Sequence, residues 1–145
     1  MTQDRSPGGT VTTGQTTTDL TWSIAANESQ AFHCTLTSIN VASSMIRYAV
    51  ATPASPTMVS FRYMQSTTSA TAVVGGFLAV QWASTCTGCT PSVTSSVLTT
   101  ALTTTLDGVI LNGSNAGSVT IYFANSATAV TNTLKKGSSC VYWKP

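Results

Sequence analysis

VILNGSNAGSVTIYF, residues 109–123, places two runs of β-branched and aromatic residues on either side of a polar segment rich in asparagine and glycine. Val109–Leu111 and Val119–Phe123 have the composition of β-strands. The segment between them, Asn112–Gly117, contains the residue types that connect paired antiparallel strands. The stretch therefore predicts a β-hairpin, and it indicates an all-β protein if similar runs recur.

Similar runs do recur from Leu20 onward, roughly every 8–15 residues. They are residues 20–24, 31–39, 45–50, 58–64, 77–83, 93–106 and 140–143. Residues 93–106 also fit a short helix, but their many threonines favour a strand. Pro53 and Pro56 mark a turn. The spacing predicts an all-β fold, an antiparallel, jelly-roll-like β-sandwich with an extended N-terminal arm.

Within residues 31–39, side chains alternate between two faces, as they do along any strand. Phe32, Cys34 and Leu36 share one face, which we expect to be buried. Cys34 is then a buried thiol. His33 points to the opposite face, toward solvent or an interface.

The composition excludes several classes of protein. The chain has 145 residues, of which 42% are hydrophobic and 7% charged, and it contains 28 Thr and 19 Ser. A disordered tail needs low hydrophobicity and high net charge, and a coiled coil needs charged heptads. The net charge of +2 comes from scattered side chains, so we expect no nucleic-acid partner. No charged residue lies between Arg62 and Asp107, so either partners cover much of this surface or its Ser and Thr hydroxyls keep it soluble.

The sequence gives no sign of a membrane segment. MTQDRSPGGT, residues 1–10, lacks the apolar core of a secretory signal peptide. The longest nearly unbroken apolar stretch, 72–80, is far shorter than the roughly 20 residues of a membrane-spanning helix. We expect no membrane partner.

Residues 1–19 differ from the rest, because Thr, Gly, Ser and Gln dominate them. They cannot form a core of their own, so we expect residues 1–19 to be an extended arm and residues 20–145 to be the β-domain. A neighbouring subunit holds the arm, or the arm folds back on its own domain. The residues predicted to bind a partner are Thr10, Val11, Thr12, Thr13, Thr16, Thr17, Thr18 and Asp19.

The chain has few groups for acid–base chemistry. Its acids are Asp4, Asp19, Glu28 and Asp107, the last standing beside Gly108 before an expected strand, and its single histidine is His33. An active site would need Glu28, Asp107 and His33 within about 10 Å of one another in one cleft. The sequence has no G-x-S-x-G motif. We therefore expect no enzyme, no catalytic residues and no cofactor.

Two of the four cysteines, Cys86 and Cys89, form a C-x-x-C motif. A single such motif is a weak zinc signal, and we expect no metal site. We place Cys86 and Cys89 at a loop tip, where a small disulfide ring between them is a candidate.

Two further groups of side chains suggest binding surfaces. Seven aromatic residues are candidates for a sugar-stacking platform: Trp22, Trp82, Trp143, Tyr48, Tyr63, Tyr122 and Tyr142. We expect most of them to belong to the core or to a subunit interface, because they are spread over separate strands. A platform would require Tyr48, Tyr63 and Trp82 to lie in a row on one exposed face. Arg47 and Arg62 lie within expected strands, where a charge needs a partner or solvent. We expect them to line a seam between subunits with Glu28 or Asp107.

Three segments resemble small virion proteins of tailed bacteriophages. They are residues 20–32, LTWSIAANESQAF; residues 51–57, ATPASPT; and GSVTIYFA at 117–124 followed by KKGSSC at 135–140. The resemblance spans roughly residues 20–143 and includes no catalytic signature. It implies a β-sandwich structural protein of a phage particle, although the chain differs from that family in Cys86, Cys89 and its Thr-rich arm.

The resemblance leads to three functional expectations. The first is a capsid decoration (cement) protein, a homotrimer on the capsid exterior that binds the major capsid protein or other virion proteins. Many copies that bind only assembled shell stabilise it by mass action. The second is a minor tail or fibre protein. The third, from a different class, is a carbohydrate-binding module for host attachment.

Overall fold

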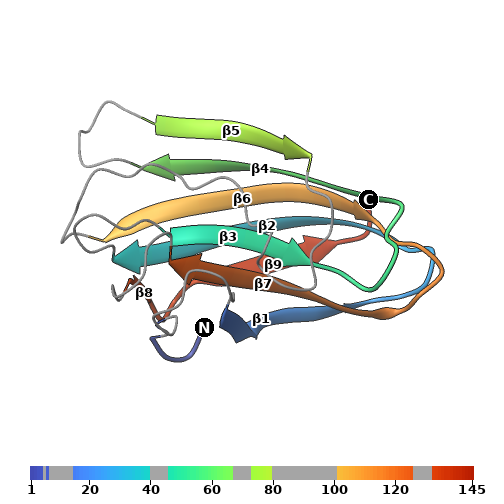
Figure 1. Ribbon diagram of the computed structural model, residues 1–145, viewed down its shortest axis with the longest axis horizontal. Helices are drawn as coiled ribbons and strands as arrows, with labels where there is room; N and C mark the ends of the chain where they lie inside the picture. Colours follow the sequence, from blue (N-terminus) through green and yellow to red (C-terminus); the bar gives the residue numbers. More distant parts are fainter. Residues whose placement is uncertain (5, 7–14, 40–45, 67–72, 80–100, 126–131) are drawn as a thin grey trace.

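The computed structural model describes residues 1–4, 6, 15–39, 46–66, 73–79, 101–125 and 132–145. These residues contain strands and no helix (Figure 1). Accordingly, no helix long and apolar enough to cross a membrane occurs among them. The strands are β1 (Gln15–Ile24), β2 (Ser29–Ile39), β3 (Ile46–Ala51), β4 (Met58–Ser66), β5 (Val73–Ala79), β6 (Leu102–Leu111), β7 (Gly117–Asn125), β8 (Thr133–Leu134) and β9 (Ser139–Trp143).

The strands form two antiparallel sheets (Figure 1). The small sheet has the order β1-β7-β3, and the large sheet has the order β5-β4-β6-β2-β8, with β9 also paired to β2. In the large sheet β2 pairs with β6 without interruption from Ser29 opposite Leu111 to Ser38 opposite Leu102. The pairing of β6 with β4 then continues the same rows of side chains across the sheet.

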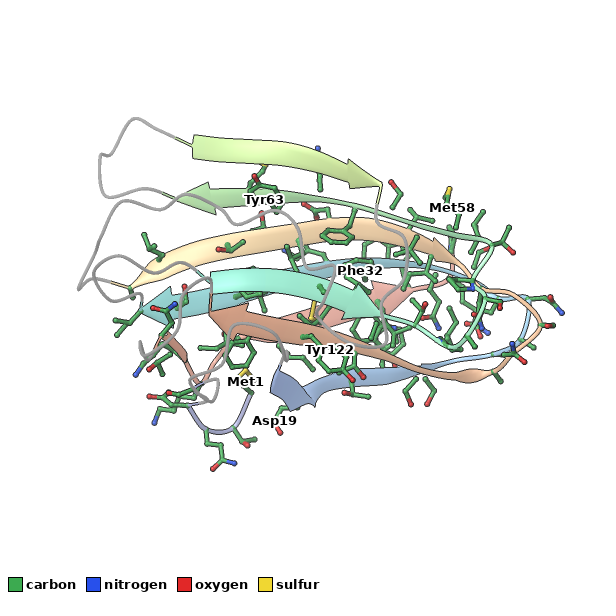
Figure 2. The ribbon with its side chains drawn as sticks, in the orientation of Figure 1. Met1, Asp19, Phe32, Met58, Tyr63 and Tyr122 are labelled. Atoms are coloured by element: carbon green, nitrogen blue, oxygen red, sulfur yellow. A yellow bond between two sulfur atoms is a disulfide. The ribbon has the colours of Figure 1, made fainter. Side chains whose placement is uncertain are left out.

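The facing sides of the two sheets share one hydrophobic core. Every second residue of β2 from Gln30 to Ser38 is buried, which confirms the expected alternation of Phe32, Cys34 and Leu36. Phe32, labelled in Figure 2, is 1% exposed. Burial of such a side chain contributes about 1.5–3 kcal/mol. The largest fully buried side chains are Phe32, Phe123, Ile24, Leu36, Leu102, Leu106, Ile110, Ile121, Leu134, Val50 and Val119.

The predicted hairpin at residues 109–123 is wrong. β6 and β7 are strands as expected, but they belong to different sheets, so the segment between them passes from one sheet to the other. The Asn112 side-chain amide donates to the carbonyls of Ala25, at 2.7 Å, and Asn115, at 2.8 Å. The Asn115 amide donates to the Ala54 carbonyl at 3.0 Å. Asparagine and glycine thus serve a connection between sheets that ties three loops together.

Asp107 and Gly108 lie within β6 and not ahead of a strand. The end of the run 93–106 and the run 109–111 therefore belong to one strand, which begins at Leu102; residues 93–100 lie outside the described part of the chain. Gly108 pairs with Phe32 on one side and with Phe61 on the other. A Cβ atom at position 108 would lie 2.5 Å from the Phe32 ring and 2.7 Å from the Phe61 Cβ. The glycine makes room for two aromatic neighbours and does not mark a turn.

Cys34 is buried, but it is not a thiol as we expected. It forms a disulfide with Cys140, its cross-strand partner in β9, across a Cα–Cα distance of 4.0 Å (Figure 2). The bond joins a central strand of the large sheet to a strand 106 residues away in sequence. Neighbouring strands bring cross-strand Cβ atoms to about 4.5–5.5 Å or closer, so the pairing of β2 with β9 provides the geometry.

The described part of the N-terminal segment lies against its own domain. The Met1 ammonium group donates to the Ser138 carbonyl, and the Gly137 N–H donates to the Met1 carbonyl at 3.0 Å. The Asp4 carboxylate contacts the Lys135 side chain and accepts from the Lys136 N–H at 2.8 Å. These contacts lower the pKa of Asp4, and the hydrogen bond from the Lys135 side chain has the largest effect. β1 moreover begins at Gln15, so it crosses the boundary expected at residue 19.

Loss of the Cys34–Cys140 disulfide should destabilise the domain strongly. In the variant Cys34→Ala/Cys140→Ala the unfolded chain regains the freedom of a loop of about 100 residues, so we expect a loss of about 2–5 kcal/mol in the free energy of unfolding. Urea denaturation measures it. The double variant Cys86→Ser/Cys89→Ser is the control, because a bond there would close only a very short loop. Free thiols at Cys34 and Cys140 in non-reduced protein would contradict the assignment.

An alanine at position 108 should also destabilise the protein, because the Phe32 ring has little room to move within a packed core. For Gly108→Ala we expect a loss of about 1–3 kcal/mol, measured by thermal or urea unfolding. Gly117→Ala is the matched control, since its Cβ would meet only the Pro53 ring, at 3.0 Å. Equal stabilities of the two variants would argue against the described packing around Gly108.

Candidate functional site

The outer face of the large sheet carries a row of charged side chains. His33 of β2 lies directly opposite Asp107 of β6, and Asp107 lies opposite Arg62 of β4. All three belong to the face that points away from the core, because Phe32, Leu106 and Phe61 beside them point inward. The expectation that His33 points outward is confirmed. Arg62 pairs with Asp107 of its own chain, whereas the expected seam lay between subunits.

Asp107 is held from both sides. Its Oδ1 lies 2.6 Å from Nδ1 of His33, and its Oδ2 lies 3.5 Å from Nε of Arg62. The side chains are 31% exposed for Asp107, 40% for His33 and 53% for Arg62. Ion pairs this exposed stabilise a fold by about 0–1 kcal/mol, so the row is poorly explained by stability alone.

A shallow depression of about 360 Å³ adjoins this row. Trp143 of β9 stands on one side, with Asp107 and Arg62 on the other. Ala31 and Ser60, two small side chains of the outer face, also line it. The remaining lining residues are Phe32, Phe61, Gly108 and Val109.

The hydroxyl of Thr35, the imidazole of His33 and the carboxylate of Asp107 form a chain of polar contacts, with 3.3 Å between Thr35 Oγ1 and His33 Nε2. Acyl transfer by such a chain also requires N–H donors for the developing oxyanion. β2 pairs with β6 on one side and with β9 on the other over residues 31–35, so its N–H groups there serve the sheet. The N–H groups of β2 beside His33 therefore do not provide such donors.

The three side chains that an active site would need are not all brought together. His33 and Asp107 touch, but Glu28 precedes β2 and lies five residues from His33, a backbone distance of about 17 Å in a strand. Glu28 accepts hydrogen bonds from the Gln30 side chain at 2.9 Å and from the Ala25 N–H at 2.8 Å. Lys144 lies 3.3 Å from it. These contacts lower the pKa of Glu28, and the hydrogen bond from the Gln30 side chain has the largest effect.

The expected sugar-stacking platform is not formed. Tyr48 and Tyr63 are 5% and 9% exposed and belong to the core, where burial raises the pKa of Tyr48 to about 12. Trp82 lies outside the described residues. Trp143, in contrast, is 50% exposed beside the charged row. Trp143 is one of the seven aromatic residues that the sequence offers for sugar stacking, but nothing in residues 140–143 indicates that they pair with β2.

The predicted partner-binding residues are only partly described. Thr10, Val11, Thr12 and Thr13 lie outside the described residues, while Thr16, Thr17 and Thr18 belong to β1. Asp19 accepts hydrogen bonds from the N–H and the hydroxyl of Thr2, at 2.9 and 3.0 Å. Asp19 therefore helps to hold the N-terminus on the domain.

Arg47, which we expected within a strand, belongs to β3.

Cys86 and Cys89, with any disulfide between them, also lie outside the described part of the chain. Within that part, no three side chains of the His, Cys, Asp or Glu type come together as a metal site. Both remaining cysteines, Cys34 and Cys140, are bonded to each other.

Comparison with protein-family models, with curated proteins and with solved structures finds no match for the chain. The class that the fold itself defines is an all-β protein of two antiparallel sheets.

Glu28 should make the stability of the protein depend on pH in the acid range. Because its pKa is lowered from the ordinary 4.5, its stabilising contribution is complete above that value and is lost as the pH falls through the lowered pKa. Glu28→Gln removes the titrating group. We therefore expect its urea midpoint to fall less than that of the wild type between about pH 6 and pH 3. The same fall in both proteins would show that Glu28 does not contribute.

Proposed function

We propose that the protein is a structural component of a bacteriophage virion, a capsid decoration protein that binds the assembled shell and stabilises it without catalysis. In this proposal the two sheets form a jelly-roll-like β-sandwich with an extended arm. Three copies associate on the capsid exterior, and the partner is the major capsid protein. The resemblance of residues 20–32, 51–57, 117–124 and 135–140 to virion proteins supports the assignment to a phage particle.

The observation that carries the proposal is the place of the arm at the edge of the small sheet. Residues 16–19 belong to β1, and among the described strands β1 pairs only with β7. An edge strand of this kind can accept a further strand from a partner. The arm therefore leads into a strand edge that assembly on the shell would cover.

We assign the contact with the shell to the segment from Thr10 to Asp19. Deletion of residues 1–19 is a poor test of this assignment, because it would also remove β1 residues and the contacts of Met1, Thr2 and Asp4 with the domain. A single substitution in the arm leaves those contacts in place. The outer face of the large sheet then points away from the shell.

The proposal predicts saturable binding of the purified protein to undecorated capsids, at positions related by capsid symmetry. Cosedimentation and electron microscopy of capsids, and separately of tails, measure it. Thr12→Lys should weaken binding at least about tenfold, because burying a charge in a contact is costly. Ser23→Lys is the control, since Ser23 is exposed on the small sheet. Binding to tails alone would favour a minor tail or fibre protein, and binding to neither would overturn the virion assignment.

A further inference from the structure

We propose that the depression beside Trp143 binds the pyranose ring of a neutral saccharide. This role goes beyond shell binding and does not depend on it, because it concerns the purified chain alone. The depression combines an exposed aromatic side chain, a floor of small residues, and a carboxylate beside a guanidinium. Each of these three features meets one requirement of a sugar ring.

The first requirement is an apolar surface for the C–H groups on one face of the ring. Trp143 is half exposed and lines the depression. Its cross-strand neighbour is Ala31, which in turn lies opposite Val109, and Val109 lies opposite Ser60. The row thus places small side chains at two of the three positions beyond the tryptophan, so a flat ring has room to lie against it.

The second requirement is a set of donors and acceptors for neighbouring hydroxyl groups. Asp107 contacts His33 through one oxygen and Arg62 through the other, which fixes the carboxylate in place. A carboxylate oxygen has more than one lone pair, and a guanidinium has five N–H donors, of which the contact of Arg62 with Asp107 uses that at Nε. An acceptor and a donor therefore stand side by side, in the pattern that two adjacent hydroxyls present.

The charges favour a neutral ligand. Arg62 and Asp107 balance each other at the wall of the depression. Lys144, the residue after Trp143, is paired with Glu28. A ligand with a net charge would therefore meet no unbalanced opposite charge among these side chains, and a wholly apolar ligand would cover Arg62 and Asp107 without hydrogen bonds. The volume is at the small end of the range for ligand sites, about 300–1000 Å³, which suits one or two sugar rings.

The test uses the full-length protein and five probes: the methyl glycosides of glucose, galactose, mannose and N-acetylglucosamine, with glucuronic acid as the anionic comparison. Amide chemical shifts in NMR titrations measure binding. We expect at least one neutral glycoside to shift the amide signals of Ala31, Val109 and Trp143. The expected Kd is roughly 1–10 mM, because a small ligand in a shallow site makes few contacts. No shift with any neutral glycoside, or binding of glucuronic acid alone, would overturn the proposal.

Variants separate this site from the rest of the face. Trp143→Ala should weaken binding at least about tenfold through the lost stacking surface, and Arg62→Gln should weaken it through a lost donor. Met64→Ala is the control, because Met64 is exposed on the same face but does not line the depression. Unchanged affinity in both Trp143→Ala and Arg62→Gln would overturn the proposal. Two variants are needed because one of them can fail to fold.

The same variants distinguish this proposal from shell binding. Trp143→Ala should lose the saccharide and still bind capsids, whereas Thr12→Lys should lose capsids and still bind the saccharide. A protein that binds capsids but no sugar retains the decoration role and loses only the ligand site.

Discussion

Ten consecutive residue pairs join β2 to β6, and their register determines both faces of the large sheet. The pairing places Phe32 over Gly108 on the inner side and His33 beside Asp107 on the outer side. A shift of β2 by one residue would exchange its two faces, so that His33 would enter the core and Phe32 would face solvent. Burial of alternate residues along β2 opposes such a shift. The core and the charged row therefore depend on the same pairing.

The sequence predicts local structure well in this protein, because alternation and turn residues act over short distances. It identifies the strands around Leu20, Phe32, Tyr122 and Tyr142, and the outward direction of His33. It does not reveal which strands pair. The hairpin at 109–123 is wrong for this reason, since the same loop composition serves two strands of one sheet or a passage between sheets. The partner of Cys34 was missed because it depends on β9 lying beside β2.

The residues of the candidate site also depend on strand pairing, which the sequence does not reveal. Arg62, Asp107 and Trp143 are separated by tens of residues, and only the order β4-β6-β2-β9 brings them together. Tyr48 and Tyr63 were plausible as a binding platform from their composition alone, but the packing of the two sheets buries both. In the two proposals made above, the arm meets the shell and the outer face of the large sheet meets a ligand, so the exposed Trp143 belongs to the ligand site.

The pairing of β2 with β9 has a consequence for the order in which the chain is made. β2 is an early strand, and the strand that covers its edge over residues 31–35 follows more than a hundred residues later. Until the ribosome has released residues 139–143, that edge of a central, hydrophobic strand stays open to other chains. Loop closure over so long a separation is also slow. The nascent domain therefore keeps this strand edge open until β9 has been made, and the pairing of β9 with β2 then covers it.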